Sequence, residues 1–249
     1  MPYEPLREKP ILPGTAATDY ERYLHTDELL ALQKTAAERN HPDELLFQVV
    51  HQSSELMMKG AIDDLERAMQ ALAAGDLNNG ARLIERANKM LDHPISLMHM
   101  LEMLTPRDYH VIRAGLGHGS GLDSPGFLGL VHLAPRLGDA FNAALEKARV
   151  NVDDVYRGGF ADAKTFGYHQ VAEQMLDFDE RLQLFRFHHL KLAQRIIGGG
   201  VIGTGGMPMD LLRQRQEHIF FKPLWEVRTR ITEEINAKRA EQATGHGKT

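Results

Sequence analysis

The sequence predicts an all-α protein, a bundle of helices in a single domain. Almost every long segment repeats its apolar residues at a spacing of three to four, and no convincing run alternates with the period of a strand. Residues that end helices fall between these periodic segments. No linker rich in glycine, serine or proline divides the 249 residues, so we expect one domain spanning residues 1–249.

The periodic segments follow one another along the chain. Three of them are Leu29 to Leu32, Leu45 to Met57, and Leu83 to Leu91. The next, Ile95 to Leu104, is apolar nearly all round, and we expect a helix that is buried on most sides. A further helix is expected around the run Phe185 to Leu192.

Stop and start signals separate these segments at residues 40–43, 74–76 and 198–200. Thr105 and Pro106 predict a helix start, with Thr105 as the cap, Pro106 in the first helical position and Asp108 near the positive end of the helix dipole. Residues 1–19 and the tail 237–249 carry little periodicity. Each is therefore expected to be mobile or to be ordered by another subunit.

Composition excludes several classes of protein. The absence of cysteine excludes disulfides, thiolate-ligated or covalently attached haem, and iron–sulfur clusters held by cysteine. A formal charge of −5 and a pI near 6.2 give no general attraction to nucleic acid or anionic lipid. No apolar run is long enough for a membrane span, and Met1 to Pro5 does not resemble a secretory signal. We therefore expect a cytoplasmic protein without a membrane or nucleic-acid partner.

His51 lies inside an apolar helical stretch. It follows Phe47 by four residues, so the two side chains share a helix face and an aromatic ring lies beside the imidazole. Glu55, one turn later, is expected either to orient this imidazole or to pair with Lys59 or Arg67. The alternative for His51 itself is a hydrogen-bonded core residue.

His189 is the second such histidine. It shares a stripe with Phe185 and Leu192, and it is favoured over His188 as the inward residue because adjacent helical residues point about 100° apart. It is either a structural residue or a metal ligand. Since no HExxH spacing supports zinc, a ligand here fits a prosthetic group such as haem, enclosed by the bundle.

Tyr109 and Arg113 lie one helical turn apart, just before the glycine-rich run 115–126. An arginine and a phenol on one face can hold a carboxylate, although Arg113 could instead pair with a helix acid. Thr204, in a second glycine-rich run, could present its hydroxyl from a closing loop or form a turn. Tyr20 and Tyr23 are expected at the surface of an early helix. Neither glycine-rich run matches a phosphate-binding fingerprint.

At these residues the chain resembles the tryptophan 2,3-dioxygenase family of haem proteins. The resemblance lies in several separated blocks with compatible spacing: Phe47 to Lys59, Phe187 to Leu190 with Arg195 to Gly198, Gly203 to Gly206, and Phe220 to Thr229. It implies a helical bundle that encloses a b-type haem. His189 would be the axial ligand of the iron, and Ser120 and Gly121 would lie at the cofactor.

The resemblance also implies a role for each residue around the substrate. His51 would be the distal histidine beside the indole N–H of L-tryptophan, and Phe47 would pack against the indole. Tyr109 and Arg113 would bind the carboxylate. Thr204 would lie on the ammonium side, and Tyr20 and Tyr23 would be lent by a neighbouring subunit of an intertwined homotetramer.

The implied reaction cleaves the indole C2–C3 bond with O2 as co-substrate and gives N-formylkynurenine, a step of tryptophan catabolism through the kynurenine pathway. The chain departs from the family pattern at Met57 and Met58, at His188 and in the run 117–119, and the stretch from Leu130 to Phe185 is shorter than in typical members. These departures leave open a substituted tryptophan as substrate, or a haem-dependent monooxygenase that hydroxylates an indole or phenol amino acid. A haem-free helical scaffold, with two structural histidines, is the third hypothesis.

Overall fold

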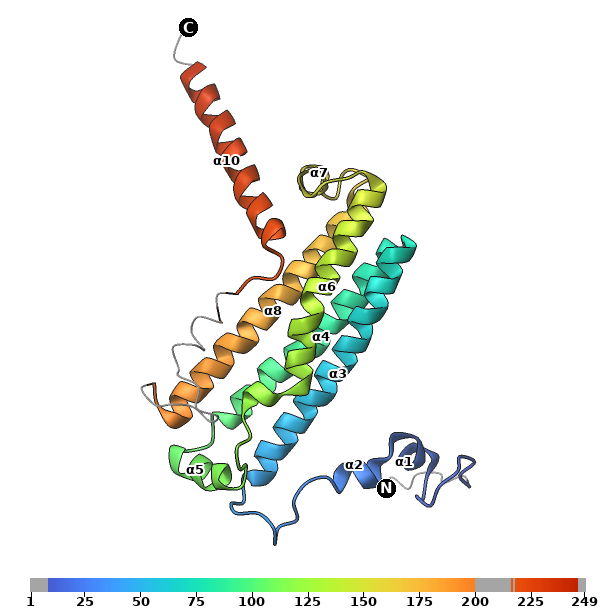
Figure 1. Cartoon of the computed structure of the whole chain (residues 1–249), viewed down its shortest axis with the longest axis vertical. Coiled ribbons are helices and arrows are strands. Elements are labelled where there is room, and N and C mark those ends of the chain that lie inside the picture. Colours follow the sequence, from blue (N-terminus) through green and yellow to red (C-terminus); the bar gives the residue numbers. More distant parts are fainter. Residues whose placement is uncertain (1–8, 200–215, 217, 246–249) are drawn as a thin grey trace, which may run out of the picture.

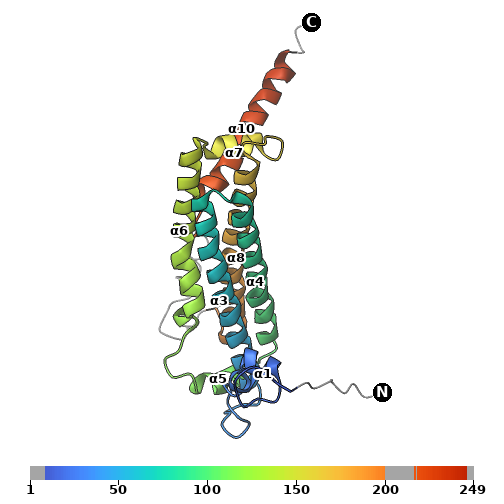
Figure 2. The same ribbon diagram turned by 90° about the vertical axis from the view of Figure 1, so that its right-hand side faces the viewer.

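The computed structural model describes residues 9–199, 216 and 218–245, and these residues form helices and loops without a β-strand. Four long helices make a bundle (Figures 1 and 2). They are α3 (Glu44–Ala74), α4 (Leu77–Leu101), α6 (Pro125–Ala148) and α8 (Phe166–Ile197). Helix α3 packs against α4 and α6, and α4 packs against α8. The predicted all-α fold is confirmed.

The shorter elements lie around the two ends of this bundle (Figure 1). Helix α5 (Pro106–Ala114) and the 3₁₀ turn η1 (Gly121–Asp123) lie at one end, and α7 (Val152–Gly158) lies at the other. We call these the α5 end and the α7 end. Helices α1 (Asp19–Leu24) and α2 (Thr26–Leu30) precede the bundle, and α10 (Lys222–Gly245) follows it. No helix in the described part of the chain is both long and apolar enough to cross a membrane.

The predicted helix boundaries are confirmed where local sequence determines them. Gly75 ends α3 with a φ of 83°, a left-handed conformation that glycine adopts without steric cost. Thr105 caps α5 by accepting from the backbone N–H of Asp108, whose carboxylate in turn accepts from Thr105. Gly198 follows the last residue of α8.

One prediction about burial is wrong. The run Ile95 to Leu104 falls mostly within the last turns of α4, but only one side of it is buried. Met98, Leu101 and Leu104 are buried, whereas Met100 is 48% exposed and Met103 is 81% exposed. The run lies at the end of a four-helix bundle, where α4 has neighbours on one side only among the described residues, so apolar content alone overestimates its burial.

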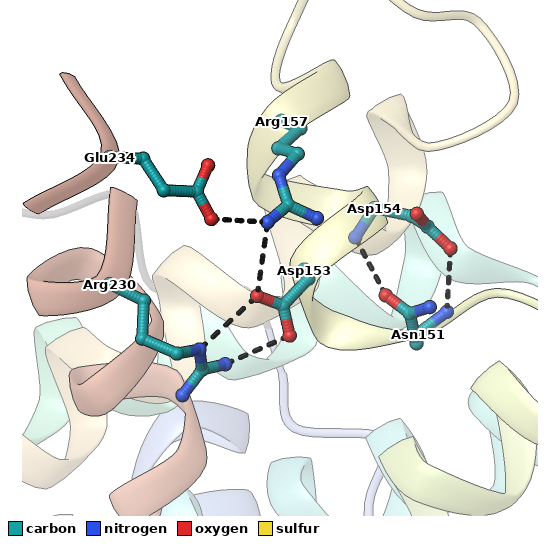
Figure 3. A network of polar contacts seen from close by, with 6 residues as sticks. All are labelled: Asn151, Asp153, Asp154, Arg157, Arg230 and Glu234. Carbon is teal, nitrogen blue, oxygen red and sulfur yellow. Dashed lines mark hydrogen bonds and ion pairs between the residues drawn. The ribbon is translucent and has the colours of Figure 1, made fainter. Parts of the chain in front are cut away.

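Helix α10 continues through Ala237 to Gly245, beyond the point where apolar periodicity ends in the sequence, and its far end extends past the bundle (Figures 1 and 2). Exposed ion pairs join its middle to α7. Asp153 pairs with Arg230 and with Arg157, and Arg157 also pairs with Glu234 (Figure 3). These contacts to α7 add to those that join the start of α10 to α8, where Trp225 donates to Asp179 and Arg228 pairs with Glu173.

Candidate active site

A cavity of about 580 Å³ lies at the α5 end of the bundle. This volume is within the range of about 300–1,000 Å³ that is typical of cofactor and small-molecule sites. Its walls come from the first half of α3, the end of α4, α5 with the loop that follows it, the start of α6 and the second half of α8. Side chains far apart in the sequence therefore meet around one space.

The α3 wall follows from the helical period. Residues four apart lie within about 40° of each other around a helix, so positions 44, 47, 48, 51, 52, 55 and 58 form one broad stripe. All of these positions line the cavity. The stripe includes His51 and Phe47, whose ring centroids are 4.1 Å apart, as the spacing predicts.

The tautomer of His51 follows from one hydrogen bond. Its Nδ1 lies 2.7 Å from the carbonyl oxygen of Phe47. Because a carbonyl can only accept, Nδ1 must donate, which leaves Nε2 of the neutral ring as an acceptor. Burial lowers the pKa of His51, while the Phe47 carbonyl and the charge of Glu55 partly oppose that shift. Part of the side chain is accessible to solvent, yet the net effect keeps the imidazole neutral at neutral pH.

His189 reaches the cavity from α8. Its ring lies parallel to that of Phe185, with a centroid distance of 6.4 Å and an interplanar angle of 4°. Burial is the main cause that lowers the pKa of His189, and the proximity of His51 lowers it further. Neither ring nitrogen forms a hydrogen bond with any described residue. A neutral imidazole without a hydrogen-bond partner, facing a largely apolar cavity, has the chemistry of an axial iron ligand.

Gly121 lies close to Nε2 of His189. A Cβ at position 121 would lie 3.1 Å from Nε2 of His189, so a larger side chain there would press on the ring. Ser120, its neighbour, also lines the cavity and caps η1 by accepting from the N–H of Leu122.

His188, adjacent in sequence, faces away from this site. Its ring packs edge-on against that of His99 on α4, with centroids 5.0 Å apart. Of the two neighbouring histidines, His189 alone lines the cavity, in agreement with the 100° rotation between adjacent helical residues.

The role expected for Glu55 is wrong. It neither bonds the ring of His51 nor pairs with Lys59 or Arg67. Its carboxylate accepts from the hydroxyl of Ser124, and it accepts at 2.8 Å from the backbone N–H of Gly126. Glu55 therefore binds the N-terminus of α6, where a carboxylate also opposes the positive end of the helix dipole.

Tyr109 lines the cavity, and its ring centroid is 6.3 Å from that of Phe47. Arg113 lies one turn further along α5, is half-buried, and does not itself line the cavity. It forms no ion pair or hydrogen bond with a described residue, so the salt bridge to a helix acid is not found there. Thr204 lies outside the described residues.

Tyr20 and Tyr23 are not brought to this cavity by their own chain. They lie on α1, which Figure 1 shows apart from the bundle, and they are 68% and 76% exposed. Other apolar residues of this N-terminal part are also exposed: Ile11, Leu24, Leu29, Leu30 and Leu32. The apolar repeat around Leu29 thus has no core to face among the residues that the structure describes.

Sequence reasoning missed several polar residues that line the cavity. Glu44, Gln48 and Gln52 lie on the same stripe of α3 as His51, and Lys34 approaches them from the segment before α3. Their spacing of four was a usable signal, because it placed them on the face of Phe47 and His51. Arg186 on α8 also lines the cavity. Nothing local in the sequence marked it, since its contact with the carbonyl of His218 is long-range.

With this geometry established, comparison with known proteins is decisive. The family model for tryptophan 2,3-dioxygenase matches residues 10–165, which is more than half of the chain. The chain belongs to the tryptophan 2,3-dioxygenase family. The matched residues include the α3 stripe, α5 and the loop that carries Ser120 and Gly121.

Relatives with the name tryptophan 2,3-dioxygenase cover most of the chain. One from Kineococcus radiotolerans is 32% identical over 87% of this chain and 92% of its own length. One from Bacillus cereus is 30% identical over 85% of this chain and 92% of its own length. One from Myxococcus xanthus is 29% identical over 92% of this chain and 96% of its own length. The Bacillus cereus alignment extends over 260 positions, whereas 85% of this chain is about 212 residues. The relative therefore contains segments that this chain lacks.

Proposed function

We propose that this protein is a haem-dependent dioxygenase that cleaves the indole C2–C3 bond of L-tryptophan, or of a substituted tryptophan, and places both atoms of O2 in N-formylkynurenine. One observation carries the proposal: in a member of this family, His51 and His189 reach one largely apolar cavity from two different helices. The proposal assigns them different roles, one toward the substrate and one toward the cofactor.

His189 would hold the b-type haem, with Ser120 and Gly121 beside it. The residues fit such a group, because a neutral imidazole faces a cavity whose wall is mainly apolar, and because the residue at position 121, close to Nε2, is a glycine without a side chain. The haem, when bound, supplies the activation of O2. Apolar side chains around it exclude water, which protects a reactive site from side reactions.

His51 would orient the substrate. Because its Nδ1 donates to Phe47, its Nε2 is available to accept a hydrogen bond from the indole N–H. The ring of Phe47, against the imidazole, offers a flat apolar surface to the indole. Together they would fix the indole plane and the direction of its N–H.

Tyr109 and Arg113 would bind the carboxylate of the amino acid. The phenol lies in the cavity wall, and the guanidinium, one turn away, has no acidic partner among the described residues. Two parallel hydrogen bonds from a guanidinium are the strongest available contact for a carboxylate. Thr204 would contact the ammonium side.

We further propose a homotetramer in which Tyr20 and Tyr23 complete the active site of a neighbouring subunit. Both rings are exposed in the single chain, together with the other apolar residues of the N-terminal part. An exposed apolar surface of this kind is typical of a contact with another subunit.

The test is the mass of the product. The haem-loaded, reduced protein is incubated with L-tryptophan and labelled O2, and the product is analysed by mass spectrometry. We expect a gain of two oxygen atoms, both labelled. A gain of one oxygen would favour the monooxygenase over the proposed reaction, and no conversion of tryptophan or its ring-substituted analogues would reject both.

A further inference from the structure

A buried carboxylate lies at the start of α3, outside the groups assigned above. Glu44 is 3% exposed. It accepts a hydrogen bond from Nζ of Lys34 at 2.5 Å and from the backbone N–H of Asn40 at 2.8 Å. Burial alone would raise its pKa, but these hydrogen bonds and the charges of Lys34 and Arg39 outweigh burial and lower it. Glu44 is therefore an ionised group in the cavity wall, and each of its carboxylate oxygens accepts a hydrogen bond.

Glu44 is the first of three acceptors that hold the connecting segment, residues 31–43, against α3. Gln48 accepts at 3.0 Å from the backbone N–H of Lys34, and Gln52 accepts at 2.6 Å from the side-chain amide of Gln33. The three acceptors are four residues apart, so they follow one stripe of the helix. The connecting segment thus runs along the same face of α3 that carries His51, and Lys34 forms part of the cavity lining.

Helix α5 rests on the same segment at both of its ends. In its first turn, Asp108 lies 3.4 Å from Nε2 of His41. At its C-terminal end, a Cβ on Gly115 would lie 2.7 Å from Nδ2 of Asn40 and 3.4 Å from Oε1 of Glu44. Such close approach is possible because residue 115 is glycine. The position of α5 therefore depends in part on the connecting segment, in which Glu44 holds Asn40, and in part on the burial of its own Ile112 in a core cluster with Val50 and Leu192.

We propose that Glu44 is a positioning residue for substrate binding. By holding Lys34 and Asn40 it fixes the connecting segment against which α5 packs, which we call the platform, and so it fixes the placement of Tyr109 and Arg113. The inference rests on the proposed function for its consequence, because these two residues are the proposed carboxylate site. The structural part of the inference, that the position of α5 depends on Glu44, does not depend on which reaction the protein catalyses.

The test compares Glu44→Gln with Glu38→Gln. Glu38 is an exposed carboxylate in the same connecting segment, and among the described residues its side chain accepts from Thr35 alone. In haem-free protein, amide hydrogen exchange of α5 should become at least about tenfold faster in Glu44→Gln, with α6 unchanged, and neither should change in Glu38→Gln. In haem-loaded protein, Glu44→Gln should raise KM for L-tryptophan about tenfold and change kcat less than about twofold, since it disturbs binding.

A purely structural role predicts a different result, namely faster exchange throughout the bundle and an unchanged KM, and this would overturn the inference. If Glu44→Gln does not fold, Gly115→Ala replaces it, because its Cβ disturbs the same platform while the Lys34–Glu44 pair stays. The same criteria then apply. Should the wild-type protein fail to convert tryptophan, the proposed function fails, whereas the exchange of α5 still decides whether Glu44 positions it.

Discussion

Two histidines of α8, one near each end of the bundle, differ in the one property that would allow a histidine to bind a haem iron. His169 is buried and His189 is half-buried, and burial is the main cause of a lowered pKa in each. At the α7 end, the ring of His169 packs edge-on against Phe160 and Tyr156, with centroids 4.4 and 5.2 Å away. At the α5 end, the ring of His189 has Phe185 on one face and the cavity beside it.

The difference teaches that burial and a lowered pKa do not identify a functional histidine. Both side chains lack a hydrogen-bond partner at Nδ1 among the described residues. Hydrogen bonding therefore does not distinguish His169 from His189 either. What separates them is open space next to the ring, which His169 does not have in the described cavities. The first prediction below tests this contrast directly, and the others follow in order of expected size.

The largest effect is expected for His189→Ala. Wild-type protein reconstituted with haem should show an intense Soret band, and the variant should lose it because the axial ligand is gone. His169→Ala is the matched control. It should keep the band while the free energy of unfolding falls by about 2–4 kcal/mol, as for other large-to-small changes in a packed core. Loss of the band in folded His169→Ala, or its survival in His189→Ala, would contradict the contrast.

The next effect is expected for Asp179→Ala in the middle of α8. Its buried carboxylate accepts from the backbone N–H groups of Phe220 and Phe221 and from the indole N–H of Trp225. Removing it leaves three donors unsatisfied, so urea denaturation should show a loss of about 3 kcal/mol or more. Haem binding should persist. Glu180→Ala, at the adjacent exposed position, should change stability by less than about 0.5 kcal/mol.

A smaller effect is expected for His51→Phe. The variant keeps an aromatic ring against Phe47 but removes the Nε2 acceptor, so kcat/KM for tryptophan should fall about tenfold to a hundredfold. The Soret band should remain. An unchanged kcat/KM would remove His51 from the substrate site, because steady-state kinetics measures the contact directly.

Acidification should destabilise the haem-free protein through His51, His169 and His189. Their pKa values are lowered in the fold, so the unfolded chain binds more protons below its ordinary pKa of 6.5. The stability is fully present above pH 6.5 and is lost as the pH falls from there toward the lower folded values. Urea denaturation at pH 7.5 and 5.5 measures the loss, which should be smaller in His169→Phe than in wild type.

The smallest effect is expected for the ion pairs that join α10 to α7. Arg230 pairs with Asp153 (Figure 3). The arginine is exposed and the aspartate is half-buried, so Arg230→Ala should cost less than about 1 kcal/mol at low salt and nearly nothing at high salt. A loss that salt does not reduce would show that packing, and not charge, holds α10.

The sequence predicted those features that depend on neighbours within one helix. The all-α fold, the cap at Thr105, the helix end at Gly75, the shared face of Phe47 and His51, and the inward turn of His189 all follow from spacings of one to four residues. The resemblance to the family added roles that no spacing could supply.

The remaining features depend on partners that are distant in sequence. Glu55 was misassigned because its partners, Ser124 and Gly126, lie on another helix. The exposure of Met103 depends on where the bundle ends, which apolar periodicity does not encode. Glu44 was missed because a carboxylate at a helix start usually needs no explanation beyond the helix dipole.

The most direct test of the central claim is a crystal structure of the haem-loaded protein with L-tryptophan. We expect an iron bound to Nε2 of His189 and the indole N–H of the substrate at Nε2 of His51. A haem held by another residue, with the ring of His189 turned away from the cavity, would contradict it.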